Sequence, residues 1–200
     1  HLATGEIIWK THEIPKTNFF SFTVPDFPVV NHHWLGQVFF YLINAAAGLN
    51  GLILFKALVV TTSFALVFFS FFKKESIFIG SLFALISIFI LAERTDVRPE
   101  IFSFLFLSWY IFVLFRENSK LMWTLPAIQF LWVNTHIYFF LGPLLFLLFF
   151  IGKLSRKEIL NWWQSRLFLA GLFIGAVNFV NPFFLKGAIY PLLVLKDYAL

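Results

Sequence analysis

Histidines and a few charged side chains are the residues able to do chemistry in an otherwise apolar chain. The histidines are His1, His12, His32, His33 and His136. Imidazoles and carboxylates can act as acid or base, or ligate a metal ion, although a histidine in an exposed loop is more often only solvated. The chain has no cysteine, which excludes disulfides, thiolate metal sites and thiol nucleophiles.

Two arginines lie in the charged segment ERTDVRPE at 93–100. Arg94 and Arg98 are four residues apart, and guanidinium groups at this spacing can hold a phosphate by paired hydrogen bonds. The alternative is a solvated turn with local ion pairs. We therefore take both arginines as candidate substrate ligands and leave this alternative open.

Further candidates are acids near the beginning of the chain and a polar interruption later in it. Glu6, Glu13 and Asp26 are the carboxylates of the first 34 residues. Asn134 and His136 interrupt a long apolar stretch. An unpaired imidazole in lipid would cost several kcal/mol, so His136 either makes a buried hydrogen bond or has a function.

Composition indicates the environment that must position these residues. Hydrophobic residues make up 60% of the 200 residues, charged residues 12%, and mean hydropathy is +0.85. Soluble domains average about 45–50% apolar and about 25% charged residues. The sequence therefore predicts an all-α, polytopic transmembrane helix bundle, and no nucleic-acid partner is expected from the net charge of +5.

The predicted organisation is a single transmembrane domain. Residues 1–34 form an outer loop with short helical or extended pieces, and residues 35–200 make five or six crossings. The apolar segment 33–48 leads into a span or lies at the interface. The expected spans are 50–72, 76–92, 100–115 and 166–182.

The apolar stretch 121–152 is too long for one span, because a continuous helix of this length would extend about 48 Å at ~1.5 Å per residue. Its interruption at 134–136 favours two short crossings. Two crossings also place most basic loop residues on one side, which the positive-inside rule assigns to the cytoplasm. These residues are Lys73, Lys74, Arg116, Lys120, Lys153, Arg156, Lys157 and Arg166. The histidines and residues 1–34 then lie outside the cell membrane.

Several segments together resemble a known superfamily. In order they are HLATGEIIWKTHEIPKTNFFSFT, NHHWLGQVFFYLI, RPEIFSF, WVNTHIYFFLG and NPFF. This order is similar to bacterial polytopic proteins of the GT-C glycosyltransferase superfamily, related to the dolichyl-phosphate-mannose protein mannosyltransferases. The resemblance covers most of the chain.

The resemblance implies an enzyme that takes a sugar from a polyprenyl-phosphate donor at the outer membrane face. It also implies an acidic residue that acts as catalytic base or ligates a divalent metal ion, Mg²⁺ or Mn²⁺. That acid is expected a few positions before His1, since we expect the chain to be part of a longer protein. Relatives tend to carry Asp at Asn18 and Glu at His33, and these departures are compatible with an altered or lost activity.

Within the chain, the resemblance and the residues together define candidate roles. The loop acids Glu6, Glu13 and Asp26 are the catalytic candidates. The candidate substrate ligands are Arg94, Arg98, His1, His32, His33, Asn134 and His136. Two other functions stay open: a transporter or flippase for a lipid-linked or anionic substrate, and a non-catalytic membrane subunit of an envelope assembly.

Overall fold

The structure is a computed structural model, and it describes residues 1–71, 96–117, 119–156 and 163–198. These residues form helices without a strand, apart from an isolated bridge between Thr17 and Pro28. The all-helical prediction is confirmed for this part of the chain. The helices are α1 (Leu2–Thr11), α2 (Trp34–Phe71), α4 (Glu100–Arg116), α5 (Ser119–Met122), α6 (Thr124–Thr135), the 3-10 helix η2 (Ile137–Phe140), α7 (Leu141–Ser155), α8 (Trp163–Val177) and α9 (Phe184–Tyr198).

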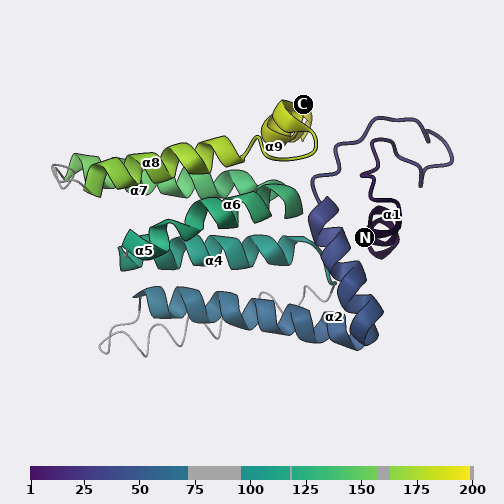
Figure 1. The fold of residues 1–200 in the computed structure, drawn as a ribbon, viewed down its shortest axis with the longest axis horizontal. Helices are drawn as coiled ribbons and strands as arrows, with labels where there is room; N and C mark the ends of the chain where they lie inside the picture. The colour runs from purple at the N-terminus through teal and green to yellow at the C-terminus, as the bar shows by residue number, and fades with distance from the viewer. Residues whose placement is uncertain (72–95, 118, 157–162, 199–200) are drawn as a thin grey trace.

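Most of the helices lie side by side. The second part of α2 runs alongside α4, and α6, α7 and α8 complete the bundle (Figure 1). The segments Trp34–Phe71 and Ile137–Ser155 are long and apolar enough to cross a membrane. The number of crossings stays a prediction, and the predicted span 76–92 lies outside the described residues.

Helix α2 consists of two helical pieces joined at Gly48. The glycine has φ 63° and ψ −165°, a conformation that a residue with a Cβ rarely adopts. The chain therefore changes direction there without a proline. This break confirms the predicted separation of the segment 33–48 from the following span at 50–72.

A second break occurs at His136, between α6 and η2. Its backbone is extended, with φ −159° and ψ 145°, so the helical hydrogen bonds of α6 stop there. Helix α7 then returns along the bundle, packing against α4 and α8. The predicted interruption of the stretch 121–152 is therefore confirmed.

The boundary expected for the last span was wrong at its end. Helix α8 ends at Val177, before the predicted limit at residue 182. The physical reason is Asn178, whose amide nitrogen Nδ2 donates to the carbonyls of Ile174 and Gly175 at 2.8 and 3.3 Å. The side chain thus satisfies carbonyls that a continuing helix would bind.

Aromatic side chains form the centre of the bundle. The ring of Phe102 lies 5.5 Å from that of Phe40 and 6.2 Å from that of Phe106. Trp132 follows, with its ring centroid 6.0 Å from Phe106 and 5.9 Å from Tyr110. Burying these large rings holds α2, α4 and α6 together.

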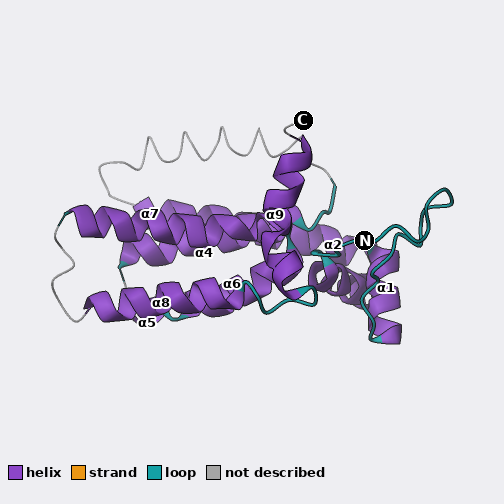
Figure 2. Cartoon of the chain, turned by 90° about the horizontal axis from the view of Figure 1, so that it is seen from above, coloured by secondary structure: helices purple, strands orange, loops and turns teal. Residues whose placement is uncertain are grey.

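The two ends of the bundle differ in polar residues. At one end lie the described basic residues in or just after the last turns of α4 and α7. Here Arg116 donates to the Phe69 carbonyl at 3.2 Å, and Lys153 pairs with Glu117. We call this the basic end. The opposite end carries the break at His136 and the beginnings of α1 and α2, and we call it the histidine end (Figure 2).

Candidate functional site

Four histidines from distant parts of the sequence meet at the histidine end, and we call His1, His32, His33 and His136 the histidine cluster. The ring of His33 lies 3.9 Å from that of His32, 5.0 Å from that of His136 and 5.8 Å from that of His1. His12 is not part of the cluster, because it caps α1 at its far end and is exposed. The four histidines that were predicted as candidate substrate ligands thus lie together, and the side of the membrane on which they lie stays a prediction.

The hydrogen bonds of His136 assign its tautomer. Its Nδ1 atom lies 2.8 Å from the Ser103 hydroxyl and accepts a longer bond of 3.5 Å from the Tyr138 backbone N–H. A backbone N–H can only donate, so the bond from Tyr138 makes Nδ1 an acceptor, and the Ser103 hydroxyl, which accepts from Trp132 Nε1 at 2.7 Å, can give its own proton to His136. Nδ1 is therefore the acceptor, and the neutral ring carries its proton on Nε2.

His33 and His32 have the opposite tautomer. His33 Nδ1 lies 3.2 Å from the carbonyl oxygen of Thr135, and His32 Nδ1 lies 3.1 Å from that of Val30. A carbonyl only accepts, so both Nδ1 atoms donate and both Nε2 atoms keep a lone pair. Among the described residues, every fully buried side-chain nitrogen or oxygen atom has a hydrogen-bond partner. The Nε2 atoms of His32 and His33 have none, so they are not fully buried.

All three partly enclosed imidazoles are neutral at physiological pH. Burial lowers the pKa of His33 to about 3, and repulsion by His32 and His136 acts in the same direction. Burial likewise lowers the pKa of His32 and of His136 to about 4, with repulsion by His32 adding to the effect at His136. The cluster therefore presents hydrogen-bond donors and acceptors without a net positive charge.

Gln37 links His1 to the rest of the histidine end. Its Nε2 atom lies 3.2 Å from His1 Nδ1, and its Oε1 atom accepts from Asn31 Nδ2 at 2.9 Å. The sequence analysis did not select Gln37 as a site residue. The available signal was its position four residues after His33, which places the two side chains on one helix face.

Asn134 connects three segments behind the cluster. Its Oδ1 atom accepts from Trp34 Nε1 at 2.9 Å, and its Nδ2 atom donates to the carbonyls of Phe130 and Val180 at 2.8 and 3.0 Å. Both amide protons are thereby used. This predicted substrate ligand lies at the site, but its geometry suits holding α2, α6 and the turn after α8 together.

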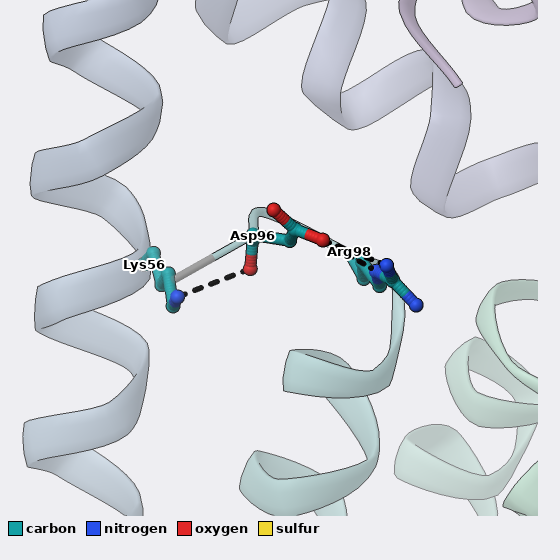
Figure 3. A network of polar contacts seen from close by, with 3 residues as sticks. All are labelled: Lys56, Asp96 and Arg98. Carbon is teal, nitrogen blue, oxygen red and sulfur yellow. Dashed lines mark hydrogen bonds and ion pairs between the residues drawn. The ribbon is translucent and has the colours of Figure 1, made fainter. Parts of the chain in front are cut away.

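Arg98 lies at the same end of the bundle, two residues before α4 begins. The first turn of α4 contains Ser103. Its Nε and Nη2 atoms bind Asp96 Oδ2 at 3.2 and 2.7 Å, and Lys56 Nζ donates to the Asp96 carbonyl at 3.0 Å (Figure 3). The side chains of Arg98 and Asp96 are 63% and 66% exposed, so the cation is accessible to a ligand. Arg94 lies outside the described residues.

The predicted acids do not join the cluster. Glu6 pairs with Lys10 at 2.6 Å on α1, while Glu13 and Asp26 are exposed between α1 and α2. Among the described residues no group of three or more histidine or acidic side chains is arranged to hold a metal ion. The cluster offers imidazoles, whereas Mg²⁺ prefers oxygen ligands, so the cluster itself does not suit Mg²⁺. The divalent ion that the resemblance implies, Mg²⁺ or Mn²⁺, stays a prediction.

Comparisons with known proteins leave the family of the chain open. No protein-family model, curated protein or solved structure matches it.

Proposed function

We propose that this chain is a multi-pass membrane glycosyltransferase that moves a sugar from a polyprenyl-phosphate donor to an acceptor at the outer face of the cell membrane. One observation supports this most: the rings of His33 and His136 lie 5.0 Å apart, and their Nδ1 bonds leave one Nε2 atom as an acceptor and the other as a donor. A sugar hydroxyl both donates and accepts a hydrogen bond, so such a pair suits a hydroxylated headgroup.

The surroundings of the cluster suit the remainder of such a donor. The exposed apolar sides of α2 and α7 can contact a polyprenyl chain, since both lie in segments apolar enough to cross a membrane. Arg98 is an accessible cation at the same end, and a guanidinium can bind the lipid phosphate through charge-assisted hydrogen bonds. Residues 1–34 lie on the outer side in this proposal.

Deprotonation of the acceptor needs a group other than the cluster imidazoles. A base with a pKa of about 3, as for His33, takes up a proton poorly at neutral pH. The proposal therefore gives the cluster a binding role and assigns base catalysis to a carboxylate. Glu6, Glu13 and Asp26 stay candidates, together with the acid that the resemblance places before His1.

The test is transfer of label from polyprenyl-phosphate sugars in membranes that contain the protein. His33→Ala and His136→Ala should each lower donor affinity roughly three- to tenfold, because each removes one hydrogen bond worth about 0.5–1.5 kcal/mol. His12→Ala is the matched control, since His12 is an exposed histidine outside the cluster. Cluster variants that bind and transfer like the control would contradict the proposed site.

A non-catalytic subunit that only binds the lipid-linked sugar is the second candidate. It is favoured by the positions of the three candidate acids, since Glu6 pairs with Lys10 on α1 and both Glu13 and Asp26 are exposed between α1 and α2. The same experiment separates the two functions. Binding of the donor that depends on His33 and His136, without any transfer of label, would support the subunit and exclude the enzyme.

A further inference from the structure

Helix α9 differs in direction from the bundle helices α4, α7 and α8. It crosses the histidine end of the bundle, and Figure 1 views it almost along its axis while α4, α7 and α8 run across the picture. Figure 2, turned by 90°, again shows α9 at a large angle to α7 and α8. Helix α9 contacts η2, so it lies directly against the turn that begins at His136.

One side of α9 packs on the bundle and the rest is exposed and largely apolar. Gly187 and Pro191, four residues apart, are buried. A Cβ on residue 187 would lie only 2.0 Å from Asn181 Oδ1, so the Asn181 side chain can pack against α9 here because residue 187 is a glycine. The exposed large apolar residues of α9 are Phe184, Leu185, Ile189, Leu192, Leu193 and Leu195.

Exposed apolar side chains also lie between α8 and α9 and on α8 and α7. Between the helices, Phe179 and Val180 are 40% and 53% exposed, and the Phe179 ring lies 5.9 Å from that of Phe184. The corresponding exposed residues of the two neighbouring helices are Leu144, Leu147, Leu148, Ile151, Phe168, Leu169, Leu172 and Phe173. Since α7 lies in a candidate membrane span, exposed apolar residues occur both on a span and on the helix that lies across its end.

We propose that α9 lies along the membrane–water boundary, with its apolar side among the lipid acyl chains of the leaflet at the histidine end. The exposed apolar residues of the adjoining α8 and of the candidate span favour lipid over a protein partner as the occupant of this surface. Lys186 and Lys196 are exposed on the same helix, and their long side chains can reach the headgroups while their stems cover apolar surface.

The inward side of α9 also forms a wall of the histidine cluster. The ring centroid of Tyr190 lies 5.0 Å from that of His32. Helix α9 therefore separates the cluster from the lipid of that leaflet while contacting both. This placement depends on the chain being embedded in a membrane, but it does not depend on glycosyl transfer.

The lack of cysteine permits a direct test by single substitutions in the full chain. Leu185→Cys, Leu192→Cys and Leu195→Cys, each carrying a nitroxide spin label, would be reconstituted in phosphatidylcholine vesicles. The accessibility of each label to oxygen and to a water-soluble nickel chelate reports its depth. We expect the three labels to favour oxygen and to lie at one shallow depth, because an interfacial helix runs parallel to the membrane surface.

Matched controls define the scale. Leu172→Cys on α8 should be deeper than all three, whereas Thr17→Cys and Lys186→Cys should favour the nickel chelate. A depth that increases steadily from residue 185 to residue 195 would overturn the proposal in favour of a crossing helix. Labels shielded from both reagents would overturn it in favour of a protein partner. If Leu172→Cys were also aqueous, the membrane placement itself would be wrong.

Discussion

The histidine cluster and the neighbourhood of Arg98 are polar regions at one end of the molecule, yet they are built differently. The cluster joins residues separated by about a hundred positions, such as His33 and Thr135, and its imidazoles are mostly enclosed. Arg98 binds Asp96, two residues away, and both side chains are exposed. Enclosed polar groups need partners because burying them unpaired is costly, whereas exposed charges are already solvated. Removing a partner should therefore matter much more in the cluster.

Acidification should produce the largest difference between the regions. His32, His33 and His136 have pKa values of about 4, 3 and 4 in the folded protein, below the ordinary 6.5. As pH falls below 6.5, the unfolded chain takes up protons that the folded cluster does not, so stability decreases until the folded pKa values are reached. The slope is up to about 1.4 kcal/mol per pH unit for each histidine. Thermal unfolding in lipid nanodiscs should therefore show a Tm that falls as the pH is lowered from about 7 to about 4.

The contribution of one histidine can be separated from the whole. His33→Asn keeps a donor for the Thr135 carbonyl but cannot titrate, so its Tm should depend less on pH than that of the unsubstituted protein. His12→Asn is the control, because it makes the same change at an exposed histidine outside the cluster. Equal pH profiles for all three proteins would show that His33 is not protonated differently in the folded and unfolded states.

Ser103→Ala should cause the next largest effect. The substitution removes the acceptor of Trp132 Nε1 and leaves His136 Nδ1 only the longer bond from Tyr138. A buried donor without a partner costs about 1–3 kcal/mol, which denaturant unfolding should detect. The control is Ser155→Ala, because the exposed Ser155 hydroxyl donates only to the Ile151 carbonyl of its own helix. A loss no larger than in this control would mean that water replaces Ser103.

Trp34→Phe should have a smaller effect. The ring stays aromatic, but the bond from Nε1 to Asn134 Oδ1 at 2.9 Å is lost. The expected cost is about 0.5–1.5 kcal/mol, because Trp34 is only half-buried and water can reach the vacated acceptor. Trp9→Phe is the matched change at a 48% exposed tryptophan on α1. Equal unfolding free energies for the two variants would show that this link between α2 and α6 contributes nothing.

The helices were more predictable than the contacts within the site. The apolar segments 33–48 and 50–72 predicted the two parts of α2, and the polar residues at 134–136 predicted the break before α7. The end of α8 was missed because it depends on one amide, that of Asn178, binding carbonyls of its own helix. A hydropathy pattern contains no information on this side-chain conformation.

The histidine end could be predicted as a region but not as a set of bonds. Alternation of basic and non-basic loops indicated that His33 and His136 share a side. It could not indicate that Ser103 and Trp132 would hold His136, because both lie in apolar helices and their partners are set by how α4 packs on α6. The loop acid Glu6 was an equally reasonable candidate, but its carboxylate binds Lys10 one turn along α1.

Arg98→Ala should have the smallest effect on stability and yet a clear effect on binding. An exposed ion pair contributes about 0–1 kcal/mol, so Tm should hardly change. If Arg98 binds the donor phosphate, its loss removes a charge-assisted bond worth about 1.5–3 kcal/mol, and affinity for polyprenyl phosphate should fall roughly tenfold or more. Lys10→Ala is the matched control, since Lys10 is also an exposed cation in a local ion pair. Equal affinities would remove Arg98 from the site, whereas a large loss of stability would show that its pair with Asp96 supports the turn before α4.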